Sequence, residues 1–97
     1  MRGFRLHLLA QEDLQEAAGY YEREKQGVGS RFLAEFERVI ERLLSHPESA
    51  PRVSRHLRMA RVGTFPYNVL YRVEDDHIFV LAVFHQRRRP GFGRGRR

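Results

Sequence analysis

The chain has 97 residues, of which 41% are hydrophobic and 31% are charged, with a formal net charge of +6. This length allows one domain, and this composition is ordinary for a folded domain and too apolar for a disordered one. The absence of cysteine excludes disulfides, thiolate metal sites and thiol catalysis. No apolar run reaches the roughly 20 residues of a membrane span, and the N-terminus lacks a signal-peptide pattern. We therefore expect a cytoplasmic protein without membrane contact.

The first half of the chain predicts a strand followed by two helices. Residues 4–9 alternate between apolar and polar side chains, as in a half-buried strand. Residues 12–26 have one apolar face at helical spacing, with Glu12 and Asp13 expected in the first turn, where negative charge suits the helix dipole. A second helix with a stronger apolar stripe is predicted over residues 30–45, and Pro47 prevents its continuation. The two helices should form an antiparallel hairpin.

The second half changes to a period of two and predicts strands over residues 57–62, 65–73 and 77–84. The last of these is continuously apolar from Ile78, which favours a central strand covered on both faces. The predicted fold class is therefore α+β. An N-terminal strand and a three-stranded antiparallel meander form a curved sheet, and the helical hairpin packs on one of its faces. Residues 1–89 are expected to form this single domain, followed by a loose basic tail over residues 90–97.

Positive charge is concentrated at the C-terminal end. Residues 1–86 contain twelve basic and twelve acidic residues, so residues 87–97, with six arginines and no acid, supply the entire excess. A second basic stretch contains Arg52, Arg55 and Arg58. Arginine favours planar anionic partners, so the clusters indicate nucleic acid or an acidic protein as partner. The excess of seventeen arginines over one lysine is explained equally well by a GC-rich genome, which does not explain the clustering.

One group of residues suggests chemistry. His85 is expected at the end of the central strand and is followed by Arg87, Arg88 and Arg89. An imidazole beside guanidinium groups could act as acid or base on a phosphodiester, with Arg61 and Arg88 as cations and without a metal. The simpler alternative is that these arginines are a solvated exit from the sheet. No histidines pair at metal-ligand spacing and no phosphate-binding loop is present, so no metal and no cofactor are expected.

Six short motifs occur in a fixed order along the chain. They are Asp13-Leu14-Gln-Glu16-Ala17, Tyr20-Tyr21-Glu22, Gly27-Val-Gly29-x-Arg31-Phe32, His46-Pro47, Phe65-Pro66-Tyr67-x-x-x-Tyr71 and Val80-x-Ala82-Val83-x-His85-x-x-Arg88-x-Pro90. Together they resemble the RelE/ParE superfamily, the toxins of bacterial type II toxin–antitoxin (plasmid stabilisation) modules. The resemblance covers nearly the whole chain. It implies the small α+β toxin fold, inhibition of growth, and neutralisation by a cognate antitoxin.

The motifs favour the ParE-like branch, which is associated with inhibition of DNA gyrase. Two departures separate the chain from the RelE-like branch of ribosome-dependent mRNA endonucleases. Asn68 stands where those members carry an arginine, and Phe92 stands where they carry a tyrosine. The resemblance therefore implies a protein-binding toxin more than an enzyme. Two alternatives stay open: a metal-independent endoribonuclease acting on ribosome-bound mRNA, and a non-toxic basic domain that binds nucleic acid.

Each interpretation has its own candidate residues. The nuclease alternative uses His85, Arg88 and Arg61 as catalytic groups. Binding of the cellular target, either gyrase or the ribosome, is assigned to four residues: Arg72, Arg87, Arg89 and Phe92. Binding of an acidic, partly disordered antitoxin is assigned to the second basic stretch, Arg52, Arg55 and Arg58.

Overall fold

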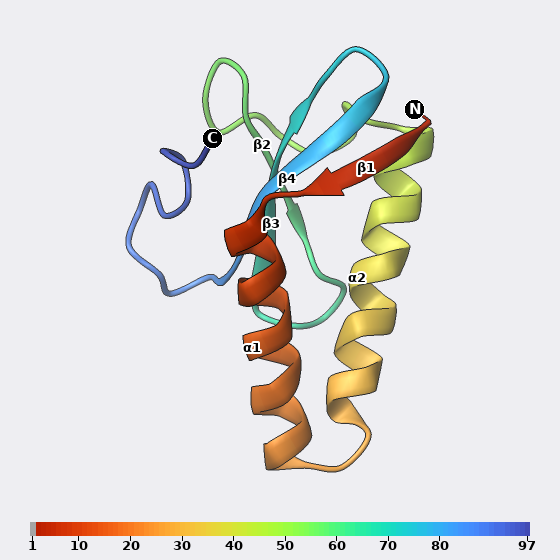
Figure 1. Cartoon of the computed structure of the whole chain (residues 1–97), viewed down its shortest axis with the longest axis vertical. Coiled ribbons are helices and arrows are strands. Elements are labelled where there is room, and N and C mark those ends of the chain that lie inside the picture. Colours follow the sequence, from red (N-terminus) through yellow and green to blue (C-terminus); the bar gives the residue numbers. More distant parts are fainter. Residues whose placement is uncertain (1) are drawn as a thin grey trace.

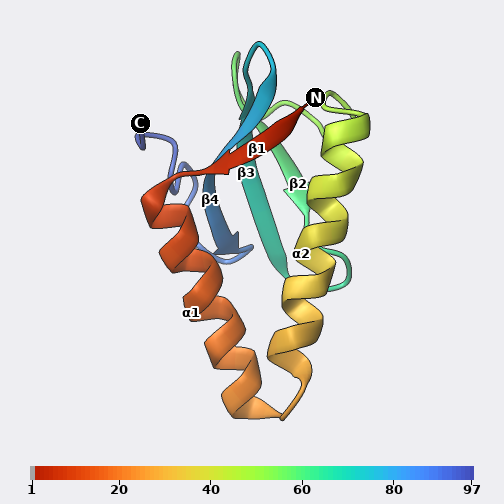
Figure 2. The same ribbon diagram turned by 45° about the vertical axis from the view of Figure 1, so that its right-hand side comes forward.

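The computed structural model describes residues 2–97 and follows the predicted order of elements (Figure 1). The order is β1 (Gly3–Leu6), α1 (Leu8–Glu24), α2 (Val28–Ser45), β2 (Arg58–Arg61), β3 (Tyr67–Val73) and β4 (His77–His85). The two helices run antiparallel and pack together on one face of the sheet (Figure 2). The α+β class and the helical hairpin are therefore confirmed. Neither helix in residues 2–97 is long and apolar enough to cross a membrane.

The four strands lie in the order β1-β4-β3-β2, so β4 occupies the interior of the sheet as predicted. β2, β3 and β4 form the antiparallel meander, while β1 pairs with β4 in the parallel direction. The parallel pair makes the sheet mixed. It arises because the helical hairpin carries the chain from β1 across one face before the meander begins, so that β4 can return beside β1.

The first helix begins earlier than the sequence pattern predicts, at Leu8 and not at Glu12. His7 caps this helix, since its Nδ1 accepts a hydrogen bond of 3.0 Å from the backbone N–H of Leu9. The predicted strand is correspondingly shorter and ends at Leu6. The expectation that Glu12 and Asp13 occupy the first helical turn is therefore wrong, and Asp13 turns toward the sheet.

The connection between the helices depends on Glu22. Its carboxylate accepts hydrogen bonds from the N–H groups of Gly27, at 2.9 Å, and of Gly29, at 3.0 Å. These N–H groups belong to the first turn of α2, which has no side-chain cap of its own at Gly27. A Cβ atom on Gly29 would lie 2.5 Å from the carbonyl oxygen of Ala18, so the helices can approach this closely only with glycine there.

The sheet has a hydrophobic core on each face. On the helix face, the large buried side chains of α2, including Phe32 and Phe36, pack against Val69 and Tyr71 of β3. On the opposite face, a smaller cluster contains Leu57, Leu70, Phe79, Leu81, Ala82 and Phe84. All of β4 from Ile78 to Phe84 is buried. The prediction that this strand is covered on both faces is confirmed.

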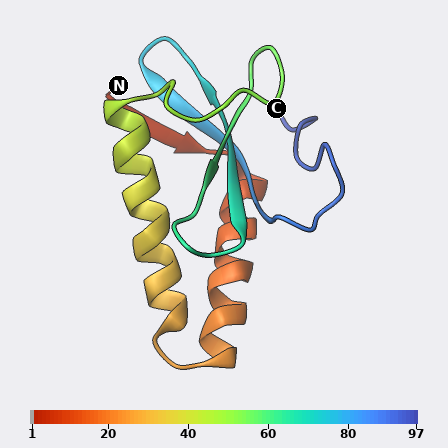
Figure 3. The same cartoon turned by 180° about the vertical axis from the view of Figure 1, so that it is seen from behind.

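The C-terminal residues pack against the sheet, whereas the composition of residues 90–97 favours a loose tail. Seen from behind, the tail leaves the end of β4 and turns back along the side of the sheet (Figure 3). Phe92 packs against Phe84 with ring centroids 5.3 Å apart, and Arg96 is paired with Asp13 of α1. These contacts supply cover for the second face of the sheet that an unstructured tail could not.

Candidate functional site

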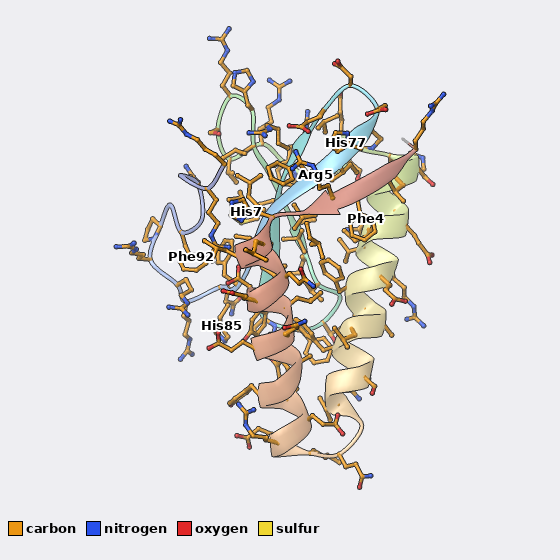
Figure 4. All side chains as sticks on the ribbon, viewed as in Figure 1. Phe4, Arg5, His7, His77, His85 and Phe92 are labelled. Carbon is orange, nitrogen blue, oxygen red and sulfur yellow. The ribbon has the colours of Figure 1, made fainter. Side chains whose placement is uncertain are left out.

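A cleft of about 210 Å³ lies where β4 ends, between α1 and the C-terminal tail. Its walls include Tyr20 and Arg23 of α1, Tyr67 of β3 and His85 of β4. Arg88 and Phe92 close it from the side of the tail. The labelled side chains of His85 and Phe92 both lie beside α1 in Figure 4. The cleft therefore joins three parts of the chain and combines aromatic surfaces with guanidinium groups.

His85 is half-buried and is held from two directions. Its ring meets that of Tyr67 edge to face, with centroids 5.3 Å apart. Its Nδ1 lies 3.0 Å from the backbone nitrogen of Arg87, which donates a hydrogen bond to it. With Nδ1 acting as an acceptor, the neutral imidazole carries its hydrogen on Nε2. In this arrangement His85 can donate a hydrogen bond through Nε2 to a ligand in the cleft.

Arg88 and Tyr67 complete the cationic and aromatic part of the cleft. The guanidinium of Arg88 lies over the ring of Phe92, 5.0 Å from its centroid. Burial raises the pKa of the Tyr67 phenol, and the nearby charge of Arg88 partly opposes this effect. The phenol therefore stays neutral at physiological pH and offers a hydroxyl group to a ligand. The cleft is suited to bind a partner through stacking, charge and hydrogen bonds.

Arg61, the third group of the nuclease alternative, lies away from this cleft. It pairs in register with Asn68, whereas His85 pairs with Tyr67. Because successive residues of a strand point to opposite faces, Arg61 and His85 lie on opposite faces of the sheet. The Nε of Arg61 donates a hydrogen bond of 3.1 Å to the carbonyl of Phe65, which fixes the side chain beside its own turn. The structure thus brings His85 and Arg88 together without Arg61.

The four candidates for target binding are divided between two regions. Phe92 lines the cleft, and Arg87 and Arg89 are exposed next to it. Arg72 lies elsewhere, on β3, where it donates two hydrogen bonds to Glu74, the shorter of 2.7 Å. These bonds hold the pKa of the Glu74 carboxyl below its usual range. Arg72 therefore forms an ion pair with Glu74, just after the end of its own strand.

A second pocket of about 210 Å³ is lined by all three arginines proposed for antitoxin binding. Arg52 and Arg55 are exposed there, beside His56 and Arg72. Arg58 holds the preceding loop in place. Its Nη1 donates hydrogen bonds to the carbonyl oxygens of Glu48, at 3.1 Å, and Ala50, at 2.8 Å. Arg52 and Arg55 are consequently the members of this stretch that remain accessible to a partner.

The sequence did not reveal the pair formed by Arg96 and Asp13, a residue that lines the cleft. Their side chains are only 16% and 14% exposed, and Arg96 Nη1 lies 2.6 Å from Asp13 Oδ2. The two residues are 83 positions apart. No local pattern relates them, although Asp13 belongs to the first of the six motifs. Among residues 2–97, no group of three or more histidines and acids gathers in a way that could hold a metal ion.

Comparison with known proteins identifies the family. Residues 4–90 match a family model described as the ParE toxin of the type II toxin–antitoxin system parDE. The chain belongs to the ParE toxin family. It is 31% identical over 90 residues to Toxin ParE2 of two strains of Mycobacterium tuberculosis, covering 92% of this chain and 86% of that protein. The protein is thus a toxin of a type II toxin–antitoxin system, as the six motifs predicted.

A solved structure supports the fold independently. It is titled as a chromosomal ParDE toxin–antitoxin system from P. aeruginosa, and it superposes with a TM-score of 0.74 at 15% identity. The match covers 88% of this chain and 96% of that chain. At this identity the likeness concerns the fold alone, and it confirms the predicted toxin fold. The family of this toxin also makes an antitoxin its expected partner class.

Proposed function

We propose that this ParE-family toxin acts in the cytoplasm as an inhibitor of DNA gyrase, and that a cognate acidic antitoxin neutralises it. Membership of the ParE branch supports the gyrase target over the ribosome. The observation that carries the choice between binding and catalysis is the separation of His85 and Arg61 on opposite faces of the sheet. A toxin that acts by binding needs no such set of catalytic groups.

Metal-independent RNA cleavage requires a base, an acid and a cation around one phosphodiester. In the cleft, His85 Nδ1 already accepts the N–H of Arg87, so the imidazole is arranged as a donor. Two carboxylates line the cleft: Asp13 is engaged by Arg96, and Glu16 is exposed on α1. The cations that line the cleft with His85 are Arg88 and Arg23. This composition supports binding of a protein surface more than proton transfer.

The cleft has the residue types that dominate binding energy at protein interfaces, where tyrosine, tryptophan and arginine are enriched. Tyr20 is 48% exposed at its edge, and Arg88 stacks on Phe92 from outside. Arg87 and Arg89 are exposed beside the same opening. Their charge would steer an acidic surface toward the cleft and raise the association rate. We assign target binding to this cleft and its rim.

Antitoxin binding is assigned to the other basic pocket, through Arg52 and Arg55. Both guanidinium groups are exposed, whereas Arg58 and Arg72 in the same pocket have carboxylate or carbonyl partners within the toxin. An acidic segment that is disordered before binding could wrap over such a surface and pair with these two side chains. The two partners would then use separate regions of the toxin.

The experiment that tests this function is pulse-labelling after the toxin is induced in bacteria without its antitoxin. We expect DNA synthesis to fall before protein synthesis, with induction of DNA-damage signalling. The double variant His85→Ala/Arg88→Ala should delay the fall, because it removes one wall of the cleft. The matched control Arg38→Ala, which removes an exposed arginine of α2, should act like the wild type.

The nuclease alternative has one observation in its favour, the proximity of His85 and Arg88 in the cleft. It predicts the opposite order, with protein synthesis falling first and cleaved mRNA accumulating. If that order is found and the double variant abolishes cleavage, the proposed gyrase inhibition is wrong. A chain that is harmless when expressed alone and binds nucleic acid with a steep salt dependence would instead support the non-toxic binding domain.

A further inference from the structure

The central strand β4 has an open edge over its C-terminal half. β1 pairs with β4 only as far as the register partners Leu6 and Val80, and the N–H of His7 donates to the carbonyl of Val80 at 2.8 Å. β4 continues beyond this point to His85, and β1 does not accompany it. The register with β3 also shifts here, because β4 has one extra residue between Val80 and Ala82. Backbone groups beyond Val80 therefore need partners other than β1.

Two side chains take the place of the missing strand. The carbonyl of Leu81 accepts a hydrogen bond of 2.9 Å from Arg96 Nη1, and the N–H of Val83 donates one of 3.1 Å to Asp13 Oδ2. Asp13 comes from α1 and Arg96 from the C-terminal tail. Their ion pair has contacts of 2.6 and 3.4 Å and is largely buried. Such charge-assisted contacts are strong, and the loss of one partner leaves the other charge buried and unpaired.

The tail between the cleft and Arg96 is fitted closely to β4. The guanidinium groups of Arg88 and Arg96 both lie over the ring of Phe92, each 5.0 Å from its centroid. Gly93 follows with a φ of +80°, and a Cβ atom there would lie 2.5 Å from Cβ of Ala82. Glycine is therefore required both by the backbone conformation and by the contact. Ion pairing, stacking and backbone fit independently hold the tail to one position.

We propose that Asp13 and Arg96 form a latch that fixes the C-terminal tail on the open edge of β4 and so sets Phe92 as a wall of the target-binding cleft. Both act as positioning residues through Phe92 and Arg88, because the carboxylate of Asp13, which lines the cleft, is engaged by Arg96 and by the N–H of Val83. This inference rests on the proposed function in assigning target binding to the cleft. Residues 90–97 contain three glycines and three arginines, so without the latch they would behave as a flexible chain. Holding them in place removes the entropy cost of ordering them when the target binds.

The latch is tested first in the full chain, by hydrogen exchange of the backbone amides of residues 91–97. We expect Arg96→Ala and Gly93→Val to speed exchange at least ~10-fold, since both release the tail. Gly93→Val removes no charge, and its matched control Gly95→Val adds the same side chain where no atom lies within 4 Å. Gly95→Val should exchange like the wild type. Arg96→Lys should fall between, because lysine keeps the charge and loses the bidentate fork.

The effect on target binding is measured with the same variants by inhibition of purified gyrase. We expect Arg96→Ala and Gly93→Val to raise the inhibitory concentration ~10-fold, with partial recovery in Arg96→Lys, no change in Gly95→Val and antitoxin affinity unchanged in all four. If the amides of residues 91–97 exchange at the same rate in the wild type and in Arg96→Ala, the proposed latch is wrong. A released tail with unchanged inhibition would overturn its positioning role. If the wild type itself leaves gyrase untouched, the proposed function fails, while the exchange rates still decide whether the latch exists.

Discussion

Tyr67 and His85 are register partners on adjacent antiparallel strands, and their rings meet edge to face with centroids 5.3 Å apart. The contact places His85 at the cleft through its shape and packing, with Nδ1 used by the N–H of Arg87. Edge-to-face pairs of this kind contribute about 0.5–1.5 kcal/mol beyond the burial of their area. His85 can therefore serve the cleft as a packed ring, whether or not it exchanges protons.

Replacing His85 by phenylalanine separates these roles. His85→Phe keeps an aromatic ring against Tyr67 and removes the imidazole as a proton donor or acceptor, so we expect growth inhibition to stay within about 3-fold of the wild type. His85→Ala removes the ring as well and should weaken the toxin by about 10-fold or more, since it opens the cleft. The measurement is the inducer concentration that halves the growth rate. Loss of toxicity in His85→Phe equal to that in His85→Ala would favour acid–base chemistry.

Tyr71 links the sheet to the loop after α2. Its ring is fully buried, and its hydroxyl donates a hydrogen bond of 2.8 Å to the carbonyl of Pro47. Tyr71→Phe should lower the free energy of unfolding by about 1–2 kcal/mol, because it removes the donor and leaves the carbonyl unpaired. Urea unfolding at pH 7 measures this difference. An unchanged unfolding midpoint would mean that water replaces the hydroxyl at no cost.

The same tyrosine predicts a pH dependence. Burial raises the pKa of the Tyr71 phenol above its ordinary value of 10.0. The neutral phenol is therefore the form that favours folding, and its contribution is complete below pH 10.0 and is lost as pH rises through the higher folded pKa. The stability difference between wild type and Tyr71→Phe should shrink above pH 10. A constant difference up to pH 11 would contradict this linkage.

The helical turn at Glu22 predicts two destabilising changes. Glu22→Ala should cost about 1–2 kcal/mol, because the N–H groups of Gly27 and Gly29 lose their acceptor at the start of α2. Gly29→Ala should cost more, since its Cβ would meet the backbone of α1 at Ala18. Glu24→Ala, an exposed neighbour on α1, is the matched control. Thermal unfolding in which Glu22→Ala equals Glu24→Ala would rule out the capping role.

Charge at the second pocket predicts the strength of antitoxin binding. Arg52→Glu/Arg55→Glu should weaken the complex at least ~10-fold at physiological salt, because two attractive contacts become repulsive. The loss should be smaller at high salt, where these charges are screened. Arg38→Glu makes a change of the same sign on the outer side of α2 and should have little effect. Calorimetric titration with the antitoxin measures the affinity of the wild type, of the double variant and of Arg38→Glu. If the double variant binds as tightly as the wild type, the antitoxin uses another surface.

Those parts of the fold that depend on local hydrophobic pattern could be predicted from the sequence. The unbroken apolar run after His77 specified a central strand, because a strand buried on both faces needs no polar side. The stripe that includes Phe32 and Phe36 specified α2 for the equivalent reason. In contrast, Leu8 and Leu9 are compatible with a strand or a helix. In the structure they are helical, and the side chain of His7 caps the helix by accepting a hydrogen bond from the N–H of Leu9. Histidine is not among the residues preferred at this position, so the sequence pattern did not signal the cap.

The site could be predicted only in part. His85 and Arg88 were found because they are close in sequence and follow the end of a strand. The place of Arg61 depends on strand register, which changes the face of a side chain with each residue. Asp13 and Arg96 meet only through the tertiary fold, and a glycine- and arginine-rich tail has the composition of a disordered segment. Its packing against the sheet depends on specific contacts of Phe92, Gly93 and Arg96 that composition does not reveal.

The most direct test of the proposed target uses purified gyrase, relaxed plasmid and ATP with increasing amounts of the toxin. We predict that supercoiling is inhibited at toxin concentrations comparable to that of the enzyme, that the antitoxin restores it, and that His85→Ala/Arg88→Ala inhibits more weakly. Supercoiling that stays unaffected by a large excess of active toxin, while the same preparation cleaves ribosome-bound mRNA, would contradict the account.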